Sequence, residues 1–171
     1  MTTIAILGAG KIGEALLSGL LTAGRPAGEL MLSERSADRA AELSRRYEVR
    51  AVDVPTAARE ADVLVVAVKP QDIGPLLDQV APAITPDTLV VSVAAGLPTS
   101  LYESHLPAGV PVVRVMPNTP ILVGEAMSAI SAGSLATAAH LQLVEELLSS
   151  VGKVVRVPES QQDAVTALSG S

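Results

Sequence analysis

The feature that most constrains this chain is a glycine motif close to its N-terminus. Glycines at positions 8, 10 and 13 follow an apolar run at residues 4–7 and open a segment with helical periodicity at residues 12–21. In a strand–turn–helix setting, the first glycine allows a tight turn, the second leaves room for a phosphate, and the third lets the helix pack closely on the strand. The N-terminus of that helix would then face the phosphates. The motif predicts a dinucleotide site, against the alternative of a glycine-rich turn without a ligand.

Beyond the motif, short apolar runs alternate with helical segments. The runs at 63–68 and 89–93 are typical of strands buried on both faces. This alternation predicts an α/β fold with a doubly wound, mostly parallel sheet and helices on both faces. The expected strands are 3–7, 30–33, 49–52, 63–68, 89–93, 112–115, 126–131 and 153–157, and the expected helices are 11–23, 36–47, 55–61, 71–83, 98–105, 135–148 and one from 159 onward.

Composition narrows the class of protein. The chain has 171 residues, of which 49% are hydrophobic, enough for a domain with a real core. The formal charge of −6, without a basic stripe, and the presence of only two aromatic residues, Tyr47 and Tyr102, argue against nucleic acid and anionic membranes as partners. With no cysteine, no apolar run of membrane-spanning length and no basic region before the first apolar stretch, we expect a cytoplasmic protein. His105 and His140 have no second ligand at metal-binding spacing, so no metal site is expected.

Residues that follow the predicted strands are the next candidates, because ligands of such sheets lie outside the carboxyl ends of the strands. The second strand is followed by Ser33, Glu34 and Arg35. An acidic side chain here usually binds the ribose hydroxyls of NAD, whereas an arginine favours the 2′-phosphate of NADP. Because both are present, these residues leave the choice of cofactor open, and Arg35 could also be a solvated charge at a helix start.

Three later loops also directly follow predicted strands. Lys69-Pro70 places a cation and a fixed φ angle at a strand end, either as a wall of the cofactor cleft or as an ordinary turn. The small residues Ala94-Ala95-Gly96 would let a flat ring lie against the backbone, or simply pack well. In Met116–Pro120, two prolines fix a loop that carries the amide of Asn118, which could hold a small substrate or make a local turn contact.

Taken together, these motifs resemble the pyrroline-5-carboxylate reductase family over the whole chain. The Met-Pro-Asn-Thr-Pro loop at 116–120 and the ending Asp-Ala-Val-Thr-Ala-Leu-Ser-Gly-Ser at 163–171 are specific, whereas the glycine motif is not. The match is carried by residues 6–13, 67–70, 92–96, 114–120, 158–160 and 163–171.

The resemblance implies a Rossmann-type domain of about eight strands whose last strands break the parallel pattern. It implies reduction of the cyclic imine Δ1-pyrroline-5-carboxylate to L-proline, the last step of proline biosynthesis, with NADP(H) preferred and NAD(H) possible. Asn118 would lie near the nicotinamide or the substrate, and Glu159 near the substrate, unless Glu159 only stabilises the last helix. The implied cofactor-binding residues are Leu7, Gly8, Ala9, Gly10, Lys11, Ile12, Gly13, Ser33, Glu34, Arg35, Val54, Ala67, Val68, Lys69, Pro70, Val93, Ala94, Ala95, Gly96 and Asn118.

The resemblance also implies a domain division. Residues 1–158 would form the dinucleotide-binding domain, and residues 159–171 the start of a helix. Family members continue with an all-helical domain that makes the dimer and supplies most substrate contacts, including a hydroxyl near the imine. We therefore expect the 171-residue chain to be inactive alone, with its homo-oligomer lost or weak. Val54 stands close to where family members often have asparagine, so contacts to the adenosine are expected to differ.

Two rival functions share the first domain. A deazaflavin-dependent NADP reductase has a similar glycine motif but is not expected to carry the ending at residues 158–171. A non-catalytic dinucleotide sensor is expected to lose the substrate loop, which is intact here at residues 116–120.

Overall fold

The computed structural model describes residues 1–169 of the chain. Its strands are β1 (Ile4–Leu7), β2 (Leu30–Ser33), β3 (Arg50–Ala51), β4 (Val63–Val66), β5 (Leu89–Ser92), β6 (Val112–Met116), β7 (Ala126–Ala132) and β8 (Gly152–Arg156). Its α-helices are α1 (Lys11–Thr22), α2 (Ala37–Tyr47), α3 (Val54–Glu60), α4 (Ile73–Val80), α5 (Thr99–His105), α6 (Ala138–Leu148) and α7 (Gln162–Ser169). Short 3-10 helices are η1 (Ala27–Glu29), η2 (Pro70–Asp72), η3 (Thr119–Val123) and η4 (Glu159–Gln161).

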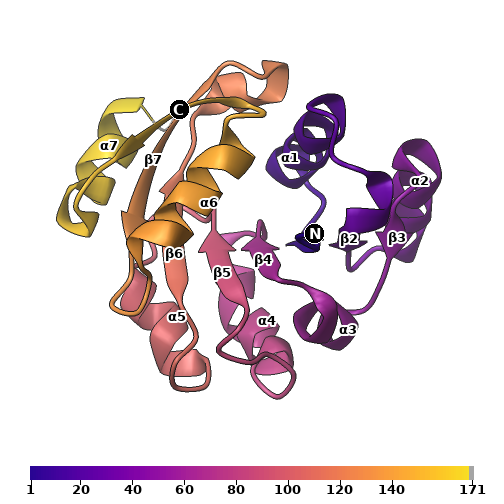
Figure 1. The fold of residues 1–171 in the computed structure, drawn as a ribbon, viewed down its shortest axis with the longest axis horizontal. Coiled ribbons are helices and arrows are strands. Elements are labelled where there is room, and N and C mark those ends of the chain that lie inside the picture. The colour runs from indigo at the N-terminus through magenta and orange to yellow at the C-terminus, as the bar shows by residue number, and fades with distance from the viewer. Residues whose placement is uncertain (170–171) are drawn as a thin grey trace.

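The strands form one eight-stranded sheet in the order β3-β2-β1-β4-β5-β6-β7-β8 (Figure 1). Strands β1 to β6 run parallel, β7 is antiparallel to β6, and β8 is parallel to β7. The predicted fold class is confirmed, as is the break in the parallel pattern at the last strands. The strand order reverses between β1 and β4, and at such a switch point the loops that follow the two strands border a crevice.

Helices cover both faces of the sheet (Figure 1). On one face, Leu17 of α1, Leu43 of α2 and Val144 of α6 are buried in one apolar cluster with strand residues. On the other face, Leu77 of α4 and Tyr102 of α5 belong to a second cluster, to which α3 also contributes. Because both faces are covered, β1, β4 and β5 are buried along their whole length, as their continuous apolar sequences predicted.

Several elements differ from the sequence expectation in their bounds; for example, the strand expected at 63–68 ends at Val66, and the helix expected from 159 begins as η4. The helix expected at 71–83 starts as η2 and its α-helical part ends at Val80, because Pro82 has no N–H to continue the helical hydrogen bonds after that of Ala81. The helix expected at 135–148 begins only at Ala138, because the side chain of Thr137 caps it by accepting from the N–H of His140. The strand expected at 49–52 is reduced to β3, which pairs only with β2 at the sheet edge.

A polar cluster ties α2 to α1 beside the glycine motif. The carboxylate of Glu14, in the first turn of α1, accepts from the hydroxyl of Tyr47 at 2.7 Å and from the guanidinium of Arg46 at 3.2 Å, and it also pairs with Arg39. The hydrogen bond from Tyr47 is the main cause that lowers the pKa of Glu14. Arg39 lies near the start of α2, and Arg46 and Tyr47 lie at its end, so these contacts hold α2 against α1 at both of its ends.

Candidate functional site

The glycine turn has the geometry that the motif predicts. Gly8 has a φ of +97°, a conformation that side-chain-bearing residues rarely adopt. A Cβ added at Gly8 would lie 2.8 Å from the carbonyl oxygen of Ala67, and one added at Gly13 would lie 2.0 Å from the carbonyl oxygen of Gly8. Gly13 therefore allows α1 to pack directly on the turn, and Gly8 allows the turn to pack on the loop after β4.

Gly10 differs from these two glycines because its surroundings are open. A Cβ built on Gly10 would meet no protein atom within 4 Å. Gly10 is also the N-cap of α1, and no side chain of residues 1–169 caps this helix. The N–H groups of Lys11, Ile12 and Gly13 precede the first intrahelical bond, from Glu14 to Gly10. The turn thus offers free N–H donors and open space at one point, which fits a pyrophosphate group.

The loops after the neighbouring strands meet the glycine turn. The N–H of Gly8 donates to the carbonyl oxygen of Ser33 at 2.9 Å, and the N–H of Ala67 donates to that of Leu7 at 2.8 Å. The N–H of Val93 donates to the carbonyl oxygen of Val66 at 3.0 Å, which adds the loop after β5 to the same edge. The structure therefore brings together the predicted groups at 7–13, 33–35, 67–70 and 93–96.

Glu34 is directed at the glycine turn. One carboxylate oxygen accepts from the N–H of Ala9 at 2.8 Å and the other from the N–H of Ser36 at 3.1 Å. Arg35 points away from this contact: its side chain is 88% exposed, and its guanidinium lies 3.8 Å from the carboxylate of Asp72. Such an exposed pair contributes little stability, so Arg35 can turn toward another anion at low cost.

Other predicted residues line the same edge with different exposure. Val93 and Ala94 are buried, whereas Gly96, with a φ of +77°, is exposed, so the loop rises out of the sheet. Lys69 and Pro70 are exposed, and Pro70 begins η2. Val54 is the first residue of α3 and packs against the second apolar cluster, as Val68 does.

Asn118 holds the loop after β6 against β7. Its side-chain oxygen accepts from the N–H of Met127 at 3.0 Å, and no contact of its NH2 group is found within residues 1–169. The following helix, η3, contacts α1, and Ile121 of η3 is buried in the same cluster as Ala9. The side chain of Asn118 does not cap η3, so the local turn contact is not formed. Its oxygen instead ties the loop to β7, and its nitrogen remains as a donor.

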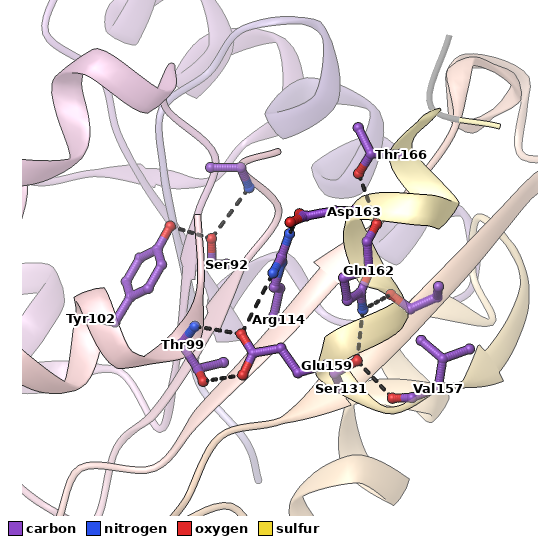
Figure 2. A network of polar contacts seen from close by, with 12 residues as sticks. Ser92, Thr99, Tyr102, Arg114, Ser131, Val157, Glu159, Gln162, Asp163 and Thr166 are labelled. Atoms are coloured by element: carbon purple, nitrogen blue, oxygen red, sulfur yellow. Dashed lines mark hydrogen bonds and ion pairs between the residues drawn. The ribbon is translucent and has the colours of Figure 1, made fainter. Parts of the chain in front are cut away.

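Figure 2 shows a polar network that the sequence analysis did not identify. Arg114 of β6 is buried, and its guanidinium lies 2.8 Å from the carboxylate of Asp163 and 3.6 Å from that of Glu159. Glu159 also accepts from the N–H of Thr99 at 2.6 Å and from the Thr99 hydroxyl at 2.7 Å. A charged residue within the apolar run at 112–115 was the available signal, because a buried cation needs partners.

Two further hydrogen-bonded groups lie beside this network (Figure 2). The hydroxyls of Ser92 and Tyr102 are hydrogen-bonded, and burial raises the pKa of Tyr102, which keeps its hydroxyl protonated. The amide nitrogen of the buried Gln162 donates to the carbonyl oxygen of Ala129 at 3.1 Å and to the hydroxyl of Ser131 at 2.9 Å. Gln162 thereby fixes the start of α7 on β7.

Among the described residues, a pocket lies away from the candidate site, and neither a metal site nor a membrane-spanning helix is found. A pocket of about 460 Å³ between the C-terminal ends of α1 and α6 shares no residue with the predicted site. Within residues 1–169, no group of three or more His, Cys, Asp or Glu side chains is placed to hold a metal ion. No helix among these residues is long and apolar enough to cross a membrane.

The fold and the glycine turn define a Rossmann-type domain with an open turn suited to a dinucleotide, and comparison with known proteins identifies its family. Residues 3–96 match the family model described as NADP oxidoreductase, coenzyme F420-dependent, and the chain belongs to this family. Over its whole length the chain is 46% identical to a pyrroline-5-carboxylate reductase of Mycobacterium tuberculosis, of which it covers 60%. The resemblance predicted from the motifs is therefore confirmed. The chain spans about 60% of the length of such curated relatives.

Solved structures support the same relationship. A pyrroline-5-carboxylate reductase from Coxiella burnetii superposes with a TM-score of 0.94 at 30% identity, over 99% of this chain and 64% of that one. The Plasmodium falciparum pyrroline carboxylate reductase, whose structure has NADP bound, superposes with a TM-score of 0.87 at 26% identity, over 99% of this chain and 62% of that one. Both cover the sheet with its reversed last strands, and both are longer than this chain.

Proposed function

We propose that the chain is the dinucleotide-binding part of an enzyme that reduces Δ1-pyrroline-5-carboxylate to L-proline. The observation that carries this proposal is the open, uncapped N-terminus of α1 at Gly10, in a chain similar over its whole length to pyrroline-5-carboxylate reductases. When bound, a reduced nicotinamide would supply the hydride. The protein's own task is to hold the cofactor and the substrate in a reactive geometry.

In this proposal, each loop at the carboxyl ends of the parallel strands binds a different part of the cofactor. The N–H groups at 11–13 bind the pyrophosphate, Gly10 leaves room for it, and residues 33–35 with Val54 surround the adenosine. Residues 67–70 and 93–96 line the nicotinamide, whose flat ring suits the small residues Ala95 and Gly96 in the more exposed part of the loop. The free NH2 group of Asn118 can donate to the nicotinamide amide or to the substrate.

Fewer residues of this chain are candidates for contacts with the substrate than for contacts with the cofactor. Asn118 and Glu159 are its candidates near the substrate, and the carboxylate of Glu159 is engaged by Thr99. We propose that the remaining substrate contacts come from a helical part beyond residues 159–171, as the resemblance implies. The 171-residue chain would then act as a small-molecule-binding domain with weak self-association. A cytoplasmic location and the absence of nucleic-acid partners stay predictions from the sequence.

A chimera tests the proposed reaction. Residues 1–169 of this chain would be joined to the C-terminal part of the Mycobacterium tuberculosis relative, which is 46% identical over the shared region. We expect the chimera to oxidise NADPH when pyrroline-5-carboxylate is added, and residues 1–169 alone to show activity lower by several orders of magnitude, because in this proposal most groups that orient the substrate lie outside them. NADPH oxidation would be followed by its absorbance.

The chimera also separates the rival functions. Reduction of NADP by reduced F420, without activity on pyrroline-5-carboxylate, would favour the deazaflavin-dependent reductase that the family description names. A folded chimera that binds NADPH but has neither activity would favour the sensor. Similarity to pyrroline-5-carboxylate reductases along the whole chain, including residues 97–171 beyond the family model, supports the first function.

We propose that the site prefers NADP(H), with NAD(H) as a possible cofactor. Arg35 is exposed and can reach a 2′-phosphate, whereas both carboxylate oxygens of Glu34 already accept backbone N–H groups. The presence of NADP in the Plasmodium falciparum relative supports this preference. The charge of Glu34 opposes it, because a carboxylate repels a phosphate.

Replacing Arg35 by alanine is expected to weaken binding of NADPH at least about tenfold, since one charge-assisted contact is worth about 1.5–3 kcal/mol, and to leave NADH affinity nearly unchanged. Isothermal titration with both cofactors measures this difference. The matched variant is Arg59→Ala in α3, which changes the same charge at an exposed helix position. An equal loss for NADPH and NADH in Arg35→Ala would show that Arg35 does not read the phosphate.

A further inference from the structure

The loop at residues 93–98, on the proposed nicotinamide side, is anchored at both of its ends. At the start, the N–H of Ala94 donates to the hydroxyl of Ser92 at 3.3 Å, and that hydroxyl is bonded to the buried Tyr102. At the other end stands Thr99, the first residue of α5, which is 3% exposed. Between the two anchors the loop contains Gly96 at a positive φ and has no strand partner.

The second anchor comes from a distant part of the sequence. Glu159, sixty positions after Thr99, accepts from both the N–H and the hydroxyl of Thr99, at 2.6 and 2.7 Å (Figure 2). No side chain of Thr99's own neighbourhood caps α5. The carboxylate of Glu159 therefore fixes where the loop ends and where α5 begins.

Arg114 holds Glu159 in this position. Its guanidinium is within 3.6 Å of a Glu159 oxygen, and Arg114 belongs to the strand that precedes the loop carrying Asn118. The side chain of Arg114 is 5% exposed, whereas that of its other partner, Asp163, is 83% exposed. Glu159 is thus the partly buried partner that links Arg114 to Thr99, whereas the carboxylate of Asp163 is exposed to solvent.

We propose that Glu159 is a positioning residue for the nicotinamide, acting through Thr99 on the loop at 93–98. This role rests on the proposed dinucleotide function. A loop that is already ordered binds its ligand without the entropic cost of fixing it at that moment. Without the Glu159 contact, the end of the loop would lose its anchor while the glycine turn and the adenosine side stay unchanged.

The test compares two ligands on the 171-residue chain. NADPH contacts both halves of the proposed site, whereas 2′,5′-ADP lacks the nicotinamide and reports on the adenosine half alone. In Glu159→Ala we expect NADPH affinity to fall about tenfold, because the loop must be ordered on binding, and 2′,5′-ADP affinity to stay unchanged. Isothermal titration gives both affinities, and thermal unfolding of each variant shows whether it is folded.

Two control variants sharpen the comparison. In Glu159→Gln the amide oxygen can still accept from the N–H of Thr99, so NADPH affinity should stay near that of the unchanged chain. Asp163→Ala removes the other carboxylate partner of Arg114 without touching Thr99, and should leave both affinities unchanged. An equal loss of both ligands in Glu159→Ala, or no loss of NADPH, would overturn the proposal. If the unchanged chain binds neither ligand, the dinucleotide function itself fails, and this role fails with it.

Discussion

Dinucleotide binding is expected to be lost in Gly10→Val while the fold is retained. The backbone at Gly10 has φ −72° and ψ −165°, an extended conformation open to any residue, and a Cβ there meets no protein atom within 4 Å. The valine side chain would instead occupy the space in front of the N–H groups at 11–13. Loss of two contacts to a charged pyrophosphate, at about 1.5–3 kcal/mol each, weakens binding at least about 100-fold.

Titration calorimetry with NADPH and NADH measures this loss, and thermal unfolding reports the fold. Gly28→Val provides the matched control, since a Cβ at Gly28 also meets nothing within 4 Å and the residue lies in η1, before β2. We expect both variants to unfold close to the temperature of the unchanged chain, with a small decrease for Gly10→Val because valine is a poor N-cap. Unchanged affinity in Gly10→Val would refute the pyrophosphate site.

Gly13→Ala is expected to lower the free energy of unfolding, whereas Gly10→Val is expected to lower mainly the affinity for the dinucleotide. The new Cβ would lie 2.0 Å from the carbonyl oxygen of Gly8, and that oxygen belongs to backbone that cannot move like a flexible side chain. Overpacking of this kind costs about 1–3 kcal/mol, and the closeness of the contact places Gly13→Ala near the upper end. The helix α1 would have to shift away from β1 and carry the N–H donors with it.

Urea unfolding of the unligated chain measures this cost. Gly74→Ala in α4 is the control, because a Cβ at Gly74 meets nothing within 4 Å and alanine favours a helix over glycine by about 1 kcal/mol. We expect Gly74→Ala to be as stable as the unchanged chain or more so. Equal stability of Gly13→Ala and the unchanged chain would mean that the close packing of α1 on the turn is not needed.

The sequence by itself determined the succession of strands and helices along the chain and the edge of the sheet at which the candidate site lies. Continuous apolar runs such as residues 63–66 mark buried parallel strands, and in a doubly wound sheet their carboxyl ends share one edge. The glycine spacing then determined the turn, because a positive φ at Gly8 and the contact at Gly13 are local requirements of strand, turn and helix. The family resemblance rested on short motifs of the same local kind.

Only the tertiary structure decided which polar side chains meet. Glu34 is next to Arg35 in sequence, yet its carboxylate turns to the N–H of Ala9, 25 positions away. The sequence suggested that Glu159 stabilises its own helix or contacts the substrate, whereas its carboxylate contacts Thr99. The partners of Arg114, Glu159 and Asp163, both follow β8 in the sequence. Such contacts join residues about 25 to 60 positions apart, and no local propensity encodes them. The contacts of Glu159 and Asp163 follow from the packing of η4 and α7 beside β6 and α5, since a buried charge such as that of Arg114 is stable only where the fold supplies its partner.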